Sequence, residues 1–161
     1  MKLKIKDQIP DIEVFQLIDG EPQQNKLRKI LGNGKIILFG LPGAFTSTCS
    51  KLHLPGFIAN ADKIKEKGIG NIFCLSVNDP YVMNAWGEVN NARDKIKMLS
   101  DPYLLFTKAI GAEVDRNSKG MGIRSNRYVM VIENLEVLNI QVENETKECG
   151  LTSAESILNN L

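Results

Sequence analysis

The feature that most constrains the fold of this chain is a strand–helix–strand pattern in its first half. Residues 35–40 form a short apolar run, which is typical of a strand buried on both faces of a sheet. After a turn at 41–45, a helical pattern covers about 47–67 and ends at Gly68. Residues 71–77 read as a second buried strand. Because the connections are short, the pattern predicts a right-handed βαβ unit with parallel strands.

The second half predicts two helices and a hairpin. Asp79-Pro80 and Asp101-Pro102 each place an acidic N-cap before a proline at the first helical position, so each pair predicts a helix start. The second of these helices is expected to stop at Gly111. Residues 127–132 and 137–142 are predicted to form the hairpin.

Both ends of the chain add short elements. Glu155 follows Thr152 at the spacing of a capping box, which predicts a final short helix that begins there. Gly20 separates two short apolar runs and indicates a hairpin before the first buried strand. The element order predicts an α/β fold of the thioredoxin-like class, with a central mixed sheet flanked by helices. The length of 161 residues and the absence of a linker predict a single domain over 1–161.

Composition excludes several classes of protein. Hydrophobic residues make up 43% and charged residues 24%, which is ordinary for a globular protein. No run approaches the roughly 18 apolar residues of a membrane span, so no membrane partner is expected. Lys and Arg number 20 against 19 Asp and Glu, and this balance argues against a nucleic-acid partner. No secretory signal follows the first residues, which favours a cytoplasmic protein, with a removed organelle presequence as the alternative.

Three cysteines and one histidine are too few for a disulfide scaffold or a structural metal set, so no metal site is expected. Cys49 is the cysteine of interest because it follows a buried strand and falls in the first turn of a helix, with Thr46 expected as the N-cap. Free N–H groups and the helix dipole favour a thiolate there, so Cys49 is a candidate nucleophile. The alternative is a small buried apolar residue.

The residues around Cys49 carry a specific resemblance. Pro42-x-x-x-Thr46-x-x-Cys49 resembles the P-x-x-x-T-x-x-C signature of the peroxiredoxins, which are thiol peroxidases on a thioredoxin fold. The surrounding sequence is similar to the peroxiredoxin-5 subgroup from about residue 5 to the C-terminus, although Ser47 stands where that subgroup usually has proline. Further matches are His53-Leu54-Pro55-Gly56-Phe57, Cys74-Leu75-Ser76-Val77-Asn78-Asp79, Trp86-Gly87, Asp101-Pro102 and Arg127-Tyr128.

The resemblance implies a role for each signature residue. Cys49 would attack hydrogen peroxide or a small organic hydroperoxide and become a sulfenic acid, with no cofactor. Thr46 would orient the thiolate and the peroxide through its hydroxyl group, and Pro42 would shield the sulfenate. Arg127 would hold the thiolate charge and polarise the peroxide, since a guanidinium does not titrate in the working pH range.

Other residues near the signature have weaker assignments. Gly43 and Phe45 are expected to border the substrate. Arg124 competes with Arg127 for the cationic role. His53 lies four residues after Cys49 on the same helical face, and a structural role is favoured for it over that of a base in a cysteine hydrolase.

The resemblance also raises the question of what reduces the sulfenic acid. In two-cysteine members of the subgroup the resolving cysteine follows Gly-Leu-Thr, whereas Ser153 follows Gly150-Leu151-Thr152 here. We therefore expect a one-cysteine mechanism with glutathione and glutaredoxin, or another external thiol, as reductant. The alternative is a Cys49–Cys149 disulfide reduced by thioredoxin. Cys74 reads as core packing.

Two further expectations concern partners and the type of activity. In the subgroup the Trp-Gly region and the loop of the reactive cysteine line a dimer contact, so Trp86 and Phe45 suggest a homodimer. A redox sensor that uses the same cysteine is the remaining alternative to a peroxidase.

Overall fold

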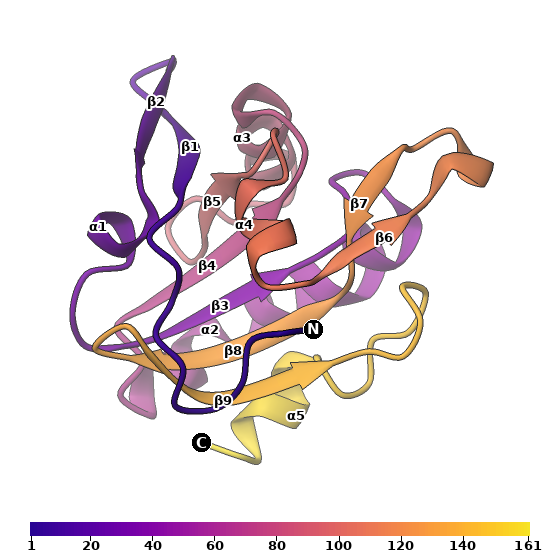
Figure 1. The fold of residues 1–161 in the computed structure, drawn as a ribbon. Coiled ribbons are helices and arrows are strands. Elements are labelled where there is room, and N and C mark those ends of the chain that lie inside the picture. Colours follow the sequence, from indigo (N-terminus) through magenta and orange to yellow (C-terminus); the bar gives the residue numbers. More distant parts are fainter.

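The computed structural model describes residues 1–161, and its centre is one mixed sheet (Figure 1). Seven strands form it: β1 (Glu13–Ile18), β2 (Glu21–Lys26), β3 (Lys35–Gly40), β4 (Asn71–Ser76), β5 (Lys97–Ser100), β8 (Tyr128–Glu133) and β9 (Glu136–Val142). Their order across the sheet is β2-β1-β5-β4-β3-β8-β9. The pairs β3–β4 and β4–β5 are parallel, and every other pair is antiparallel.

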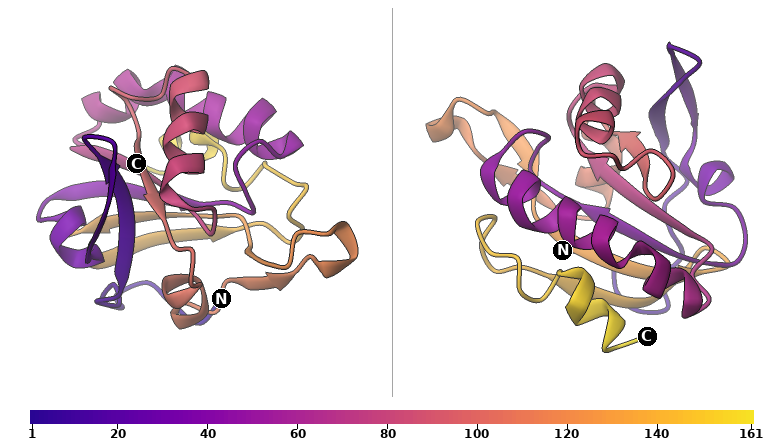
Figure 2. Two further views of the ribbon diagram at one scale, coloured as in Figure 1. Left: turned by 90° about the horizontal axis from the view of Figure 1, so that it is seen from above. Right: turned by 180° about the vertical axis from the view of Figure 1, so that it is seen from behind.

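Helices cover both faces of this sheet. They are α1 (Leu27–Leu31), η1 (Cys49–His53), α2 (Leu54–Glu66), α3 (Pro80–Val89), α4 (Leu105–Ala109), η2 (Asn117–Lys119) and α5 (Ala154–Leu158). Side chains of α2, α3 and α5 form one apolar cluster with one face of the sheet, and those of α1 and α4 form a second cluster with the other face. Seen from behind, α2 and α5 lie along the same face (Figure 2). The expected thioredoxin-like α/β fold is therefore confirmed. None of these helices has both the length and the apolar character needed to cross a membrane.

The βαβ unit is present as expected, with β3 and β4 in parallel register from Ile36 opposite Asn71. The helix between them contains a π-helical turn, η1, which the sequence pattern did not indicate. Pro55-Gly56 does not interrupt the helix, because α2 continues through both residues. Pro55 lies in the first positions of α2, directly after the change from π to α hydrogen bonding, where its missing N–H costs little.

Two of the expected helix starts are displaced. The first helix after β4 begins as predicted, with the Asp79 carboxylate accepting from the Val82 N–H at 2.9 Å. By contrast, α4 begins at Leu105 rather than directly after Asp101-Pro102, because Leu104 adopts a left-handed conformation and the Asp101 carboxylate reaches forward to the Thr107 N–H. At α5 the cap is Ser153 instead of Thr152.

The predicted hairpins are both present. β1 and β2 meet at Asp19 and Gly20, and β8 pairs with β9. The sequence patterns did not indicate β5 or a second small sheet, formed by β6 (Glu113–Asp115) and β7 (Ile123–Ser125) with η2 between them. In the main sheet, Gly40 lies directly opposite Tyr128, and a Cβ atom at Gly40 would overlap the buried tyrosine ring.

Candidate active site

Cys49 lies at the start of the helical segment that follows β3. It is the first residue of η1 and comes after two helical residues, Ser47 and Thr48. The Ser50 N–H donates to the Thr46 carbonyl oxygen at 2.9 Å, so Cys49 lies inside the first helical turn, as expected. The cysteine is 1% exposed.

Thr46 directly precedes this helical segment, but its hydroxyl group does not cap it. The Oγ1–H donates to the Gly43 carbonyl oxygen at 2.8 Å, so the expectation of a capping side chain is wrong. The hydroxyl group closes the short loop that carries the signature instead. With its proton directed to Gly43, the Oγ1 atom keeps lone pairs that can accept a hydrogen bond from another molecule.

Asn78 holds the same loop in place, a function that sequence reasoning did not assign to it. Its Oδ1 accepts from the Ala44 N–H at 2.8 Å and from the Ser76 hydroxyl at 2.7 Å. Because Asn78 follows β4, these bonds attach the loop after β3 to the end of the neighbouring parallel strand. A Cβ atom on Gly43 would lie 3.3 Å from the Asn78 Oδ1 and 3.0 Å from the Arg124 Nη1, so the close fit favours glycine there.

Arg127 brings a guanidinium group to the Cys49 sulfur. It directly precedes β8, whose first residue pairs with the last residue of β3. Its Nη2 donates to the Cys49 Sγ at 3.3 Å and to the Thr146 carbonyl oxygen at 2.9 Å. Its Nη1 contacts the His53 Nδ1 at 2.8 Å. The residue is fully buried.

No carboxylate forms an ion pair with Arg127. The two ion pairs of the protein join Lys26 to Glu13 and Lys147 to Glu145. A buried cation without an anion is costly. Of the three groups that Arg127 contacts, only the sulfur can carry a negative charge. A guanidinium group beside a cysteine sulfur is typical of the surroundings of a reactive cysteine.

His53 supports Arg127 from the other side. Its Nδ1 faces the guanidinium group and its Nε2 lies 3.0 Å from the Thr152 carbonyl oxygen, so the neutral ring carries its proton on Nε2 and accepts at Nδ1. Burial, and then the charge of Arg127, lower the pKa of His53 to about 3. Both ring nitrogens are occupied away from the sulfur, which leaves no nitrogen to act as a base for Cys49.

A hollow of about 90 Å³ opens beside Arg127. Its lining comes from the signature loop, from the β6–β7 hairpin and from the segment before α5. The residues are Pro42, Thr46, Ser47, Thr48, Arg116, Met121, Arg127, Thr146 and Lys147. Three of the four expected catalytic residues line it, and the fourth, Cys49, is joined to it through Arg127.

Comparisons with known proteins identify the family of this chain. The Redoxin family model matches residues 4–159. Peroxiredoxin-2D of Arabidopsis thaliana is 41% identical over 99% of this chain and 98% of its own. The chain belongs to the peroxiredoxin family. Members of this family are thiol peroxidases, and this peroxiredoxin is therefore an enzyme.

Solved structures of other peroxiredoxins have the same fold. Reduced Prx3 of Vibrio vulnificus, in complex with hydrogen peroxide, is 40% identical with a TM-score of 0.92, and the match covers 98% of both chains. Peroxiredoxin 5 of Alvinella pompejana is 32% identical with a TM-score of 0.84, over 98% of this chain and 96% of that one. Plant relatives at 39% and 36% identity are named as chloroplastic and mitochondrial forms.

Three residues near the peroxiredoxin signature lie outside the hollow. Gly43 and Phe45 do not line it, and the Phe45 side chain is 58% exposed on a backbone with a φ of 61°. Arg124 does not contact the sulfur. Its Nε donates to the Met121 carbonyl oxygen at 2.7 Å and its Nη1 to that of Pro42 at 3.4 Å, so it supports the signature loop from behind.

The other two cysteines of the peroxiredoxin differ in their surroundings. Cys74 is fully buried on β4, where burial, and then the nearby Cys49, raise the pKa of its thiol well above the usual value. Cys149 is partly buried in the segment before α5, and burial raises the pKa of its thiol as well. A raised thiol pKa leaves less thiolate at neutral pH, so neither cysteine is prepared for nucleophilic attack.

The segment of residues 143–153, which we call the C-terminal loop, lies over this site and is held through its backbone. Arg127 donates to the Thr146 carbonyl oxygen, and the Thr48 hydroxyl donates to that of Lys147 at 3.2 Å. The His53 Nε2–H donates to the Thr152 carbonyl oxygen. The loop is closed at its base by the buried Glu143, whose Oε1 accepts from the Thr152 N–H at 2.8 Å and from its hydroxyl at 3.0 Å.

Proposed function

We propose that Cys49 is the peroxidatic residue of this peroxiredoxin, and that it reduces hydrogen peroxide and small organic hydroperoxides. The observation that carries the proposal is the buried Arg127 guanidinium group, which has no carboxylate partner and lies 3.3 Å from the Cys49 sulfur. The relative in complex with hydrogen peroxide supports this choice of substrate.

In the first half of the proposed reaction, the hydroperoxide oxidises Cys49. The thiolate attacks the terminal oxygen of the hydroperoxide, an S–O bond forms and the O–O bond breaks. The second oxygen leaves with the electron pair as hydroxide or alkoxide and takes a proton from water, while Cys49 becomes a sulfenic acid. Arg127 stabilises the thiolate and the charge that develops on the peroxide. Thr46 accepts the peroxide proton in a hydrogen bond and Pro42 restricts access to the sulfenate.

For the reductive half we propose a one-cysteine mechanism. An external thiol, such as glutathione with glutaredoxin, condenses with the sulfenic acid and releases water, and a second thiol then frees Cys49. The proposal is supported by Ser153, which stands where two-cysteine members have cysteine, by the full burial of Cys74 and by the raised pKa of the partly buried Cys149 thiol. A Cys49–Cys149 disulfide reduced by thioredoxin is the alternative, because the C-terminal loop that carries Cys149 lies over the site.

Stopped-flow oxidation followed by intact-protein mass measurement tests both proposals. Cys49→Ser should abolish the fast reaction with hydrogen peroxide, whereas Cys74→Ser and Cys149→Ser should keep it. Without added thiol, the oxidised parent should gain one oxygen atom. A fast phase in Cys49→Ser would refute the first proposal, and a peptide pair linked through Cys49 and Cys149 would refute the second. Steady peroxide consumption with glutathione and glutaredoxin should separate the peroxidase from a redox sensor.

We also propose that the enzyme is a cytoplasmic homodimer. Phe45, Leu52 and Tyr81 are each more than half exposed, and exposed aromatic side chains such as Phe45 and Tyr81 are common anchors of interfaces. Trp86 is not such an anchor, since it is fully buried and its Nε1–H donates to the Ser50 hydroxyl at 3.0 Å. Sedimentation at micromolar concentration should give a dimer that Phe45→Ser weakens. Three unpaired thiols are compatible with a reducing compartment, which cell fractionation should identify.

A further inference from the structure

The charge of the hollow beside Cys49 is a feature that the thiol chemistry alone does not require. Three cationic residues line it, Arg116, Arg127 and Lys147, and no aspartate or glutamate does. We propose that Arg116 is a specificity-determining residue that makes the enzyme prefer small hydroperoxides carrying a carboxylate group. This inference rests on the proposed function, because the hollow is taken as the place where the hydroperoxide meets Cys49.

Arg116 is held firmly at the tip of β6. Its N–H donates to the Gly122 carbonyl oxygen at 2.9 Å, and its own carbonyl oxygen accepts from the N–H groups of Lys119 and Met121 at 2.9 and 3.2 Å. These bonds fix the backbone on both sides of the β6–β7 hairpin. The side chain that lines the hollow therefore starts from a rigid base.

The side chain of Arg116 has no partner within the protein. It forms neither a hydrogen bond nor an ion pair, and its Nε is buried without an acceptor. The adjacent carboxylate of Asp115 is occupied, because its Oδ1 accepts from the Asn117 N–H at 2.7 Å. Buried donors in folded proteins nearly always have a partner, so an unsatisfied guanidinium N–H beside a hollow indicates a group that is supplied from outside.

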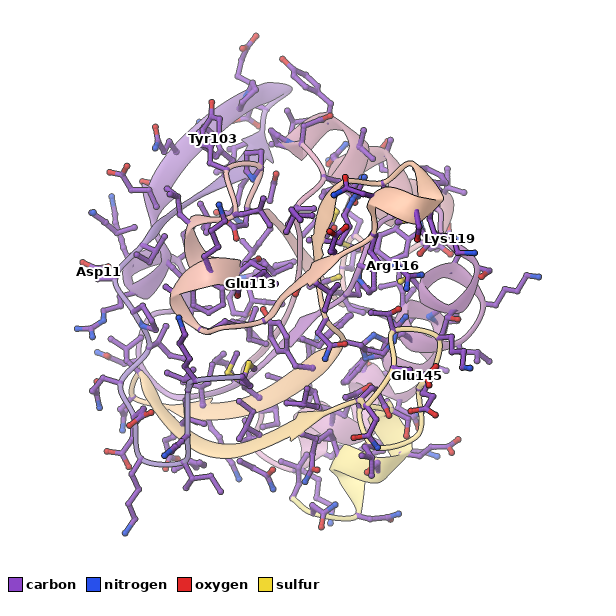
Figure 3. All side chains as sticks on the ribbon, turned by 45° about the vertical axis from the view of Figure 1, so that its right-hand side comes forward. Asp11, Tyr103, Glu113, Arg116, Lys119 and Glu145 are labelled. Carbon is purple, nitrogen blue, oxygen red and sulfur yellow. The ribbon has the colours of Figure 1, made fainter.

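The other cations near the hollow are already engaged. Arg127 is bonded to sulfur, His53 and a carbonyl oxygen, and Arg124 is bonded to two carbonyl oxygens. Lys147 forms an ion pair with Glu145 at 2.9 Å. Arg116 and Glu145 lie on the same side of the molecule, one on the β6–β7 hairpin and the other on the C-terminal loop (Figure 3). The Nε of Arg127 also lacks an acceptor, but both of its Nη atoms are engaged. Arg116 is thus the cation whose whole guanidinium group is free for an anionic ligand.

A carboxylate matches this capacity. Guanidinium and carboxylate groups form charge-assisted hydrogen bonds that are stronger than neutral ones, and the planar fork of arginine favours the carboxylate geometry. The volume of about 90 Å³ restricts the preference to small molecules. A hydroperoxide anchored at Arg116 presents its O–O bond toward Arg127 and Cys49, and the bond changes are those already described: the S–O bond forms, the O–O bond breaks and the alkoxide takes a proton.

The test compares two matched hydroperoxides that differ only in charge. One is tert-butyl hydroperoxide with a carboxylate on one methyl group, and the other carries the corresponding amide. The rate constant of Cys49 oxidation is measured for both compounds and for hydrogen peroxide, with no reducing thiol present. Arg116→Gln removes the charge, Arg116→Lys keeps it, and Lys119→Gln is the matched control, because Lys119 lies on the same hairpin but does not line the hollow.

The parent should prefer the carboxylate to the amide by about fivefold or more, the size expected for a partly exposed ion pair near 1 kcal/mol. Arg116→Gln should bring this ratio close to one, Arg116→Lys should restore part of it, and Lys119→Gln should leave both the ratio and the rate with hydrogen peroxide unchanged. The preference should also decrease with added salt.

Two results would overturn the inference: a ratio near one in the parent, or a ratio that Arg116→Gln leaves intact. In a separate assay with glutathione, an effect of Arg116→Gln that is confined to reduction of the sulfenic acid would overturn it too, since glutathione also carries carboxylates. Failure of the proposed function is distinguishable, because the parent would then show no fast reaction of Cys49 with hydrogen peroxide itself.

Discussion

The Nη2 of Arg127 lies 3.3 Å from the Sγ of Cys49, although 78 positions separate the two residues in the sequence. The contact is a consequence of the sheet. β3 ends at Gly40, opposite the first residue of β8, so the chain leaving β3 toward Cys49 and the residue entering β8 meet at one edge.

Replacing Arg127 should separate its charge from its geometry. Arg127→Gln removes the cation beside the sulfur, and loss of one preorganised donor of this kind lowers a rate by about a hundred- to a thousandfold. Arg127→Lys keeps the charge but cannot contact Cys49, His53 and Thr146 at once, so its rate should lie between those of the parent and of Arg127→Gln. The measurement is the rate constant with hydrogen peroxide. Arg124→Gln is the matched control, and a loss as large as that of Arg127→Gln would contradict the assignment.

Thr46 should act through its oxygen atom. Thr46→Val has nearly the same shape but cannot accept the peroxide proton or donate to Gly43, and we expect the rate with hydrogen peroxide to fall by about ten- to a hundredfold. Thr46→Ser keeps the hydroxyl group and should stay close to the parent. Equal rates for the valine and serine variants would exclude a role for the hydroxyl group in the reaction.

His53 should position Arg127 rather than react. His53→Asn offers an amide oxygen where Nδ1 accepts from Arg127, whereas His53→Gln offers an amide N–H where Nε2 donates to Thr152. We expect the asparagine variant to retain more of the peroxide rate. The glutamine variant should instead preserve the attachment of the C-terminal loop, measured by amide hydrogen exchange of residues 144–152. The opposite ranking in both measurements would disprove this division of roles.

Acidification should destabilise the protein through His53. The pKa of His53 is about 3 in the folded protein and 6.5 for an unburied histidine, so His53 of the unfolded chain is protonated first as the pH falls. The stabilisation is complete above pH 6.5 and is lost progressively toward pH 3, in total on the order of a few kcal/mol. Urea unfolding across this range should give a steeper decline of the free energy of unfolding in the parent than in His53→Asn. Parallel curves would contradict the prediction.

Replacing two different glycines with alanine should change the free energy of unfolding in opposite directions. Gly40→Ala places a Cβ against the buried Tyr128 ring, and such overpacking should cost about 3 kcal/mol. Gly56→Ala lies within α2, where a Cβ meets nothing within 4 Å, and it should stabilise by about 0.5–1 kcal/mol. Urea unfolding measures both changes. A neutral Gly40→Ala would mean that Tyr128 can move aside.

Local signals were sufficient for much of the fold. The βαβ unit and the β8–β9 hairpin follow from apolar runs and turn residues that act over short distances. The β1–β2 hairpin follows from Gly20 and the apolar residues of β1 alone, because β2 is a polar strand. The misplaced helix starts depend on partners farther along the chain: the Asp101 carboxylate bonds to Thr107, and the Thr152 hydroxyl is taken by Glu143 instead of capping α5. The four-residue strand β5 also depends on its neighbours, since it pairs between β4 and β1.

The same division applies to the site. Pro42, Thr46 and Cys49 belong to one local signature, and the family resemblance added Arg127. Arg116 carries no pattern of its own, and only the folding of the β6–β7 hairpin brings it to the hollow. The sequence likewise did not indicate that the C-terminal loop borders the site, because its contacts are made by backbone carbonyl groups, which every residue type has.

The attachment of the C-terminal loop through its backbone affects which substitutions this enzyme can accept. The C-terminal loop is held by hydrogen bonds to its backbone carbonyl groups. Every residue type provides the same carbonyl oxygen to Arg127, Thr48 and His53. Apart from Thr146 and Lys147, which line the hollow, side chains along 144–151 are therefore open to substitution without loss of these hydrogen bonds. A second thiol could be acquired or discarded there by a single replacement, so the choice of reductant can evolve separately from the attack on peroxide.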